Sequence, residues 1–278
     1  MAAASIIIRP LKDHAEFRQC ERLQKEVWGT VAASGEVLFV TQKNGGMILG
    51  AFAKKRVVGF IYAFLGRRKG LLIHWSHMMG VERAYRDRHL GYRMKLVHRE
   101  HALRQGIRSI AWTYDPLQSR NAVLNLARLG AEIDEYLPDC YGHFPSAIEK
   151  GLPSDRLVAN WRISSGRVQR RLSGEETASS RTDLPRVNET TTDSRGLLTN
   201  RRLHLDLTDS RLLLEIPTNT DEMRALDMKL ALRWRLEAGR LFLRYFRLGY
   251  HVQDFVAPTT NGDHRAFYLL SRSGAAGG

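Results

Sequence analysis

The residues best suited to chemistry lie in one stretch of the sequence, Val81-Glu82-Arg83-Ala84-Tyr85-Arg86-Asp87-Arg88-His89-Leu90-Gly91-Tyr92. The apolar pattern places this stretch between a strand and the start of a helix. Backbone N–H groups at a helix start, together with the positive end of the helix dipole, suit a phosphate or pyrophosphate. Arginines in the same turn can add charge-assisted, bidentate hydrogen bonds. The stretch therefore predicts an anion site, and an ordinary solvated basic turn is the alternative.

Histidines nearby are candidates for proton transfer. His77 lies near the end of the strand before the turn, and a histidine titrates close to neutral pH, so it can serve as a general base. A hydrogen-bonded core histidine is the alternative. His74 is three residues away and should therefore lie on the opposite face of the strand. His98 and His101 share one helical face, but two ligands without a third make a poor metal site, so we expect no metal.

The elements that must position these residues follow from short apolar blocks whose period keeps switching. Such switching predicts a mixed α/β domain. Asp13 can cap the first helix, which Gly29 can end. Strands are expected at 5–8, 47–53, 57–65, 71–81, 109–114, 132–136 and 157–163, and helices at 13–29, 90–105 and 119–129.

The composition shifts after this region. Residues 173–194 are rich in Ser, Thr, Glu and Arg, with almost no large apolar residue, which is typical of a mobile linker. We expect a domain over 1–164, a polar linker over 165–195 and a C-terminal β-α-β-β region over 196–278. Its elements are expected at 212–216, 221–249, 250–256 and 266–270, with Gly239 as a weak point of the helix.

The charge of the chain favours polyanionic partners. Lys and Arg number 43 against 29 Asp and Glu, a net charge of +14. Because the basic residues are spread along the chain, a solvated basic surface is the plain alternative. Trp112-Thr113-Tyr114 could stack single-stranded nucleic acid, although such aromatics are more often core.

Neither a membrane nor a secretory protein is expected. The longest nearly apolar run, 57–65, is far short of the roughly 20 residues that span a bilayer. The N-terminus lacks a basic region followed by a long apolar one. Cys20 and Cys140 are too few for a disulfide framework, and we expect both to be buried thiols in a reducing compartment. A globular, cytoplasmic protein is the expectation.

Over roughly residues 5 to 164 the order of elements and the basic turn resemble the GNAT acetyltransferase family. In that family the turn reads Arg/Gln-x-x-Gly-x-Gly/Ala and cradles the pyrophosphate of acetyl-CoA. The matching positions here are Arg86, Asp87, Arg88, His89, Leu90 and Gly91. The hairpin 50–60, with a glycine in each arm, and the helix 121–130 are also typical of the family.

Further motifs resemble an uncharacterised bacterial branch of the same family. They are Ser76-His77-Met78, the segment Thr113 to Ala122, Tyr141-Gly142 and Asp155-Arg156-Leu157. The resemblance continues through the C-terminal region, at Trp234-Arg235 and Gly249-Tyr250. That region could be a degenerate second GNAT half, and it could extend the first sheet, cover the acceptor side or form a homodimer contact.

The resemblance implies direct transfer of an acetyl group from acetyl-CoA to an amine of a small molecule or protein. The implied cofactor-binding residues are Met79, Gly80, Val81, Arg86, Asp87, Arg88, His89, Leu90, Gly91, Tyr92 and Asn121. His77 is the implied base. The family's leaving-group tyrosine falls at Leu126, so Tyr114, Tyr136 and Tyr141 are candidate substitutes.

Two departures from the family pattern keep an alternative open. Asp87 and His89 stand where the family usually has glycine, which puts a carboxylate and a ring close to the expected pyrophosphate. The alternative is a catalytically impaired module of the same fold, whose basic surface binds nucleic acid or an acidic partner.

Overall fold

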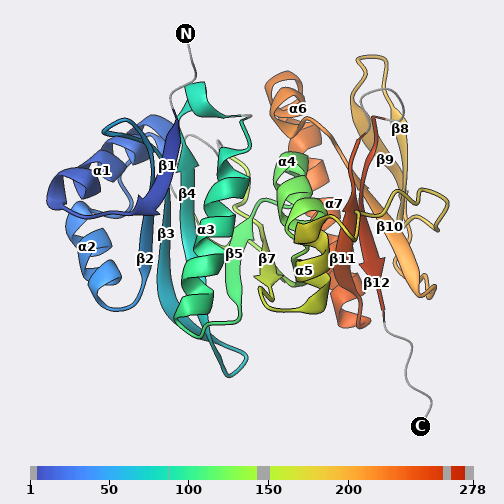
Figure 1. Cartoon of the computed structure of the whole chain (residues 1–278). Helices are drawn as coiled ribbons and strands as arrows, with labels where there is room; N and C mark the ends of the chain where they lie inside the picture. The colour runs from blue at the N-terminus through green and yellow to red at the C-terminus, as the bar shows by residue number, and fades with distance from the viewer. Residues whose placement is uncertain (1–4, 87, 143–150, 259–263, 273–278) are drawn as a thin grey trace. The chain divides into compact units, whose positions relative to one another are not determined.

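The computed structural model describes residues 5–86, 88–142, 151–258 and 264–272 (Figure 1). The chain divides into two compact units. Unit 1 contains the described residues 5–112 and 162–164, and unit 2 contains the rest. The boundary between them falls inside one strand, β5 (Ile110–Tyr114).

Unit 1 is a sheet with three helices. The strands lie in the order β1 (Ile6–Pro10), β2 (Met47–Ala53), β3 (Arg56–Arg68), β4 (Leu71–Val81) and β5. The first three pairings are antiparallel, and β4 pairs with β5 in parallel. The helices are α1 (His14–Trp28), α2 (Gly35–Lys43) and α3 (Leu90–Arg104), with a 3₁₀ turn, η1 (Arg83–Tyr85), between β4 and α3.

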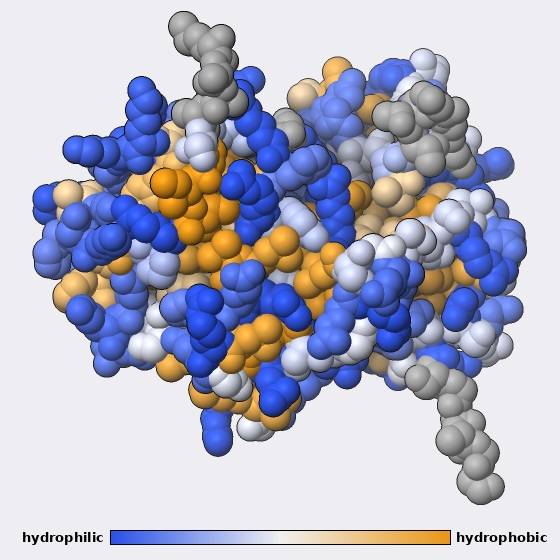
Figure 2. Space-filling view, viewed as in Figure 1, coloured by the Kyte–Doolittle hydropathy of each residue, from blue (hydrophilic) through white to orange (hydrophobic). Residues whose placement is uncertain are grey.

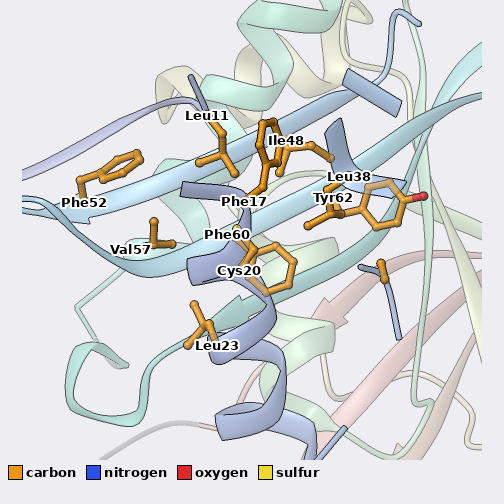
Figure 3. Packing of buried hydrophobic residues seen from close by; sticks show 11 residues of the cluster. Leu11, Phe17, Cys20, Leu23, Leu38, Ile48, Phe52, Val57, Phe60 and Tyr62 are labelled. Atoms are coloured by element: carbon orange, nitrogen blue, oxygen red, sulfur yellow. The ribbon is translucent and has the colours of Figure 1, made fainter. Parts of the chain in front are cut away.

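The two faces of the unit 1 sheet are covered by different helices. Alternation along β2 sends Ile48 and Phe52 into the cluster under α1 and α2, and Met47 and Leu49 into the cluster under α3. Figure 3 shows side chains of α1 meeting those of β2 and β3 in the first cluster. The sheet therefore has an α1/α2 face and an α3 face.

Unit 2 is built on a second run of antiparallel strands. Their order is β7 (Arg156–Trp161), β6 (Glu132–Leu137), β11 (His251–Val256), β12 (Ala266–Ser271) and β10 (Arg211–Ile216). The helices are α4 (Ser119–Ala122), η2 (Val123–Arg128), α5 (Gly166–Ser173), α6 (Thr220–Leu226) and α7 (Met228–Arg247). Two further strands, β8 (Asn188–Thr192) and β9 (Leu198–Leu203), pair with each other.

The segment after β5 is joined to the C-terminal elements of unit 2. The Arg235 guanidinium on α7 donates two hydrogen bonds of 2.7 Å to the Asp115 carboxylate. The Ser119 hydroxyl donates to the Thr218 carbonyl at 2.9 Å, and the Thr220 hydroxyl donates to the Leu117 carbonyl at 2.6 Å. The motif 113–122 is thus an attachment of this segment to α6 and α7.

The expected fold class is confirmed: a mixed α/β protein with mostly antiparallel strands flanked by helices. The C-terminal β-α-β-β order is present as β10, α6 with α7, β11 and β12. The expected helix 221–249 is divided, because the Asp227 side chain accepts from the Leu230 amide and starts a new helix.

The expectation of a mobile linker over 173–194 is wrong in part, because β8 lies in it, and α5 occupies the start of the expected polar linker 165–195. Ser165 caps α5, whose Val168 and Arg171 are buried. Arg171 is held by the Asp254 carboxylate at 3.0 Å. Polar residues order this segment through hydrogen bonds, which an apolar pattern does not reveal.

The face drawn in Figure 2 is largely hydrophilic, with apolar residues showing between the hydrophilic ones. In the described part of the chain, the helices are all too short or too polar to cross a membrane. Cys20 is a buried free thiol, as expected, whereas Cys140 is only half-buried.

Candidate functional site

The start of α3 differs from the starts of the other long helices. Among the described residues no side chain caps α3, and its first turn holds no acidic residue. The other helices of eight residues or more all have a capping side chain: Asp13, Ser34, Ser165 and Asp227. A helix start carries unsatisfied N–H groups and partial positive charge. The amides of Leu90, Gly91 and Tyr92 are therefore suited to an anion.

The residue before α3 adopts the conformation that a glycine favours. His89 is the N-cap residue, with φ of 55°, and its side chain is exposed. Left-handed backbone costs a non-glycine residue roughly 1–2 kcal/mol. The glycine-like shape of the turn is kept despite the substitution. Asp87, the other departure, lies outside the described residues.

Basic side chains surround this helix start. The Arg86 side chain is exposed, and its Nε donates to the Val81 carbonyl at 3.0 Å. The exposed Arg88 guanidinium lies 5.6 Å from the ring centroid of Tyr85. The acidic residue closest in sequence before the turn, Glu82, is engaged by Arg56 at 3.0 Å. The turn is therefore electropositive.

The strand leading to this turn has an unpaired edge. Among the described residues, β4 pairs with β5 only at His74 with Ile110 and at Trp75 with Ala111. Beyond Trp75, β4 continues to Val81 while it stays paired with β3 on its other side. We call the point where β4 and β5 stop pairing the fork. On its β5 side, the described part of β4 beyond Trp75 therefore pairs with no strand, and the Val81 carbonyl accepts from Arg86.

A β-bulge lies on β4 just past the fork. Tyr62 is opposite Met78 and Ala63 is opposite Ser76, so His77 is the extra residue. The His77 ring contacts Tyr62 and Phe64, with ring centroids 5.7 and 6.0 Å away, and is exposed at the α1/α2 face. Partial desolvation lowers the pKa of His77 from its ordinary value. The ring is therefore neutral and able to accept a proton at neutral pH.

His74 lies on the other face of β4, as its spacing from His77 predicted. Its Nδ1 shares a hydrogen bond of 3.0 Å with Nε2 of His98 on α3. Burial lowers the pKa of His74 to about 4. In the described part of the chain no group of three or more His, Cys, Asp or Glu side chains is arranged to hold a metal ion.

The remaining candidates belong to unit 2. Tyr114 is buried, and its hydroxyl donates to that of Tyr268 at 3.4 Å, while burial raises its pKa. The Tyr136 hydroxyl donates to Asp155 at 2.5 Å. Tyr141 is 40% exposed. Its hydroxyl is 2.7 Å from the Thr113 hydroxyl.

Two more positions with an implied role lie in unit 2, Asn121 and Leu126. Asn121 is exposed and is the third residue of α4, whose N-cap residue is Gln118. Leu126 is fully buried in η2. Of the three candidate tyrosines, Tyr141 is the one with an exposed side chain.

Sequence reasoning missed one residue of unit 1, Lys95. It is 2% exposed and occupies the buried stripe of α3. The signal was available, because Lys95 falls between Met94 and His98 on the side of the helix that carries Leu90 and Ala102. A lysine in such a stripe is rare unless it is paired or functional.

No protein-family model and no curated protein matches the sequence. Among solved structures, the chain is similar to a GNAT-family acetyltransferase from Streptococcus pneumoniae, with 16% identity over 56% of this chain and 98% of that one, at a TM-score of 0.46. It is similar to aminoglycoside 6'-acetyltransferase type Ii, with 18% identity over 57% and 98% and a TM-score of 0.46. It is also similar to Arabidopsis thaliana Naa50 in complex with a CoA-containing bisubstrate analogue, with 14% identity over 56% and 97% and a TM-score of 0.45. The chain is thus similar, over rather more than half its length, to acetyltransferases, among them one of the GNAT family.

Proposed function

We propose that the protein is an acyltransferase that moves an acetyl group from acetyl-CoA directly to an amine. The observation that carries the proposal is the unpaired edge of β4, which leads from a bulge at His77 to the uncapped, arginine-rich start of α3. An extended, amide-containing chain that ends in a diphosphate fits a free strand edge followed by a helix N-terminus.

Each part of this site has a role in binding. The amides of Leu90, Gly91 and Tyr92 and the guanidinium groups of Arg86 and Arg88 would hold the diphosphate. The backbone of Met79, Gly80 and Val81 would pair with the pantetheine arm and polarise the carbonyl. Asp87, His89 and Asn121 complete the set that the family resemblance implies. Acetyl-CoA, when bound, supplies an activated acyl group.

His77 is the proposed base. An amine must lose its proton before it can attack a carbonyl, and its pKa near 10 makes a base necessary at neutral pH. His77 is exposed on the face opposite α3, so it can receive a proton from an acceptor that approaches there. Because its pKa is lowered from 6.5, we expect the acid-side fall of kcat/KM to lie below that pH. We expect His77→Ala to lose this acid limb, and full turnover of that variant across pH 6 to 9 would refute the role.

The C-terminal region, 196–278, is proposed to be a degenerate GNAT half without a site of its own. In unit 1, β4 and β5 flank α3 and pair directly before they separate. In unit 2, the strands that flank α6 and α7, β10 and β11, are separated by β12, which pairs with both. This arrangement leaves no free edge between β10 and β11. The proposal includes a cytoplasmic location, where acetyl-CoA is available.

Thermal melting with acetyl-CoA tests the function. A ligand at 100 times its dissociation constant stabilises a protein by about 2.7 kcal/mol. We expect such a shift for the native protein, and a loss of about tenfold or more in affinity for Arg86→Ala, because a charge-assisted hydrogen bond contributes about 1.5–3 kcal/mol. Arg202→Ala, an exposed residue of β9, is the charge-matched control. No shift with millimolar acetyl-CoA, together with a salt-sensitive shift on adding RNA, would overturn the proposal in favour of a nucleic-acid-binding module.

A further inference from the structure

A buried amine lies at the fork between β4 and β5. The Lys95 side chain extends from α3, and its Nζ donates to the Ser76 hydroxyl at 3.1 Å. The same Nζ lies 3.5 Å from the ring centroid of Trp112. Ser76 and Trp112 are the residues that directly follow the last paired residues of β4 and β5. Lys95 therefore contacts both strands at the point where they separate.

Among the described residues, this amine has no carboxylate partner. Its contacts within the described residues are a hydroxyl and an aromatic ring. Complete burial lowers the pKa of Lys95 to about 7, so the group can both hold and release a proton at neutral pH. An unpaired buried cation is expensive, and strongly perturbed groups cluster at functional sites. A leucine or methionine would fill the position at no such cost.

Among the described residues, the titratable groups near Lys95 are histidines. On α3, His98 and His101 follow at intervals of three residues, and on β4 His74 is hydrogen-bonded to His98. From β5 the facing side chain is the Trp112 ring. Burial and the neighbouring basic groups lower the pKa of His98 far below its ordinary value, so the proton of this cluster resides on Lys95.

The histidines extend from the fork toward solvent. In the described chain, Nδ1 of His98 has no hydrogen-bond partner, so it can still accept or donate one. His101, one turn further along α3, is half-buried. A row of ionisable groups thus begins at the fork: Lys95, His98 and His101, with His74 beside His98.

We propose that Lys95 is the proton donor to the sulfur that leaves the acyl group. The inference rests on the proposed function, in which the pantetheine arm follows β4 from Val81 toward Ser76. That stretch of extended strand is roughly 16 Å long. As the carbon–sulfur bond breaks, its electron pair stays on sulfur. A proton passes from the ammonium of Lys95 to sulfur, which gives a thiol and a neutral amine.

The remaining steps restore Lys95. The neutral amine takes a proton back from solvent through the histidine row, so the cluster returns to its starting state. This role accounts for the family's leaving-group tyrosine being replaced by the fully buried Leu126. His77 and Lys95 lie on opposite faces of β4, which separates the group that accepts a proton from the group that gives one.

The test measures the sulfur of bound CoA rather than turnover. A free thiol with a pKa near 8.5 is about 3% thiolate at pH 7. The ultraviolet absorbance of the thiolate is recorded for CoA bound to the protein, with bound desulfo-CoA as the blank. We expect the thiolate fraction of bound CoA at pH 7 to rise about tenfold, because the positive charge of protonated Lys95 beside the sulfur stabilises the thiolate anion.

Two variants separate a proton donor from a structural lysine. Lys95→Met should return the thiolate fraction to that of free CoA. Lys95→Arg should keep the raised thiolate fraction, because it keeps the charge, but lose turnover, because a guanidinium does not give up its proton. Circular dichroism and a melting curve establish that each variant is folded.

The native protein alone can overturn the proposal. A bound thiolate fraction equal to that of free CoA would refute it even if neither variant folds. Desulfo-CoA binding separates this failure from that of the proposed function. If desulfo-CoA binds and the thiolate fraction is unchanged, the Lys95 inference is wrong. If neither CoA nor desulfo-CoA binds, the proposed function itself is wrong.

Discussion

Burial of the Lys95 amine predicts how the free energy of unfolding changes with pH. In the unfolded chain this lysine keeps its proton up to its ordinary pKa of 10.5, whereas in the folded chain burial lowers the pKa to about 7. Between these values the unfolded chain binds more protons than the folded one, so stability rises with pH. Below pH 7 both states carry the proton, and the folded state bears the full penalty of the buried charge.

The size of the effect follows from the same two values. Each pKa unit corresponds to about 1.4 kcal/mol, so this one side chain should raise the free energy of unfolding by about 5 kcal/mol between pH 7 and pH 10.5. In Lys95→Met this contribution disappears. The variant should therefore have its greatest stability advantage at pH 7 and below, and the advantage should shrink steadily above it.

Urea unfolding of both proteins at intervals between pH 6 and pH 10 measures this difference. Lys55→Met, at an exposed position between β2 and β3, is the matched control and should leave the pH dependence unchanged. A free-energy difference between native protein and Lys95→Met that stays constant across the range would show that the lysine is not buried as a titrating amine. Such a result would also remove the basis of its assignment as a proton donor.

Three further predictions concern other positions. Gly239→Ala should destabilise by about 1–3 kcal/mol, instead of the usual gain for alanine in a helix, because a Cβ there would lie 2.7 Å from the Tyr136 hydroxyl; an unchanged or raised melting temperature would contradict this. Asp115→Ala should cost about 3 kcal/mol by leaving Arg235 buried without its partner, and denaturant unfolding measures it. His89→Gly should relieve roughly 1 kcal/mol of left-handed strain, which a higher melting temperature would reveal, and calorimetry should detect tighter acetyl-CoA binding.

The elements that carry the site could be predicted because their sequence signals are local. The expected strand 71–81 matches β4 (Leu71–Val81). Asp13 caps α1, and Gly29 ends it in the left-handed conformation, as their residue types indicate. The basic turn lies between a strand and a helix as the pattern required. Apolar periodicity, capping residues and helix-ending glycines depend on neighbouring residues alone, so they can be recognised in a single sequence.

Features that depend on pairing could not be predicted. The bulge at His77 is a difference in register between β3 and β4, and no residue type marks it. To predict the fork, one would have to know how far β5 runs beside β4.

Helix α2 (Gly35–Lys43) of unit 1 was not predicted for another reason. It exposes Val37 and Val40, so its apolar residues do not form a single buried stripe.

The attachment of the segment after β5 to α6 and α7 has a consequence for any shortened form of the protein. Removing the last third of the sequence would remove Arg235, the ion-pair partner of Asp115. It would also remove β11, with which β6 pairs at Ile133 and Val252. An uncovered strand edge of this kind invites aggregation. The C-terminal third is therefore no detachable appendage. Any shortened version of this protein would need a new cover for that edge before it could stay in solution.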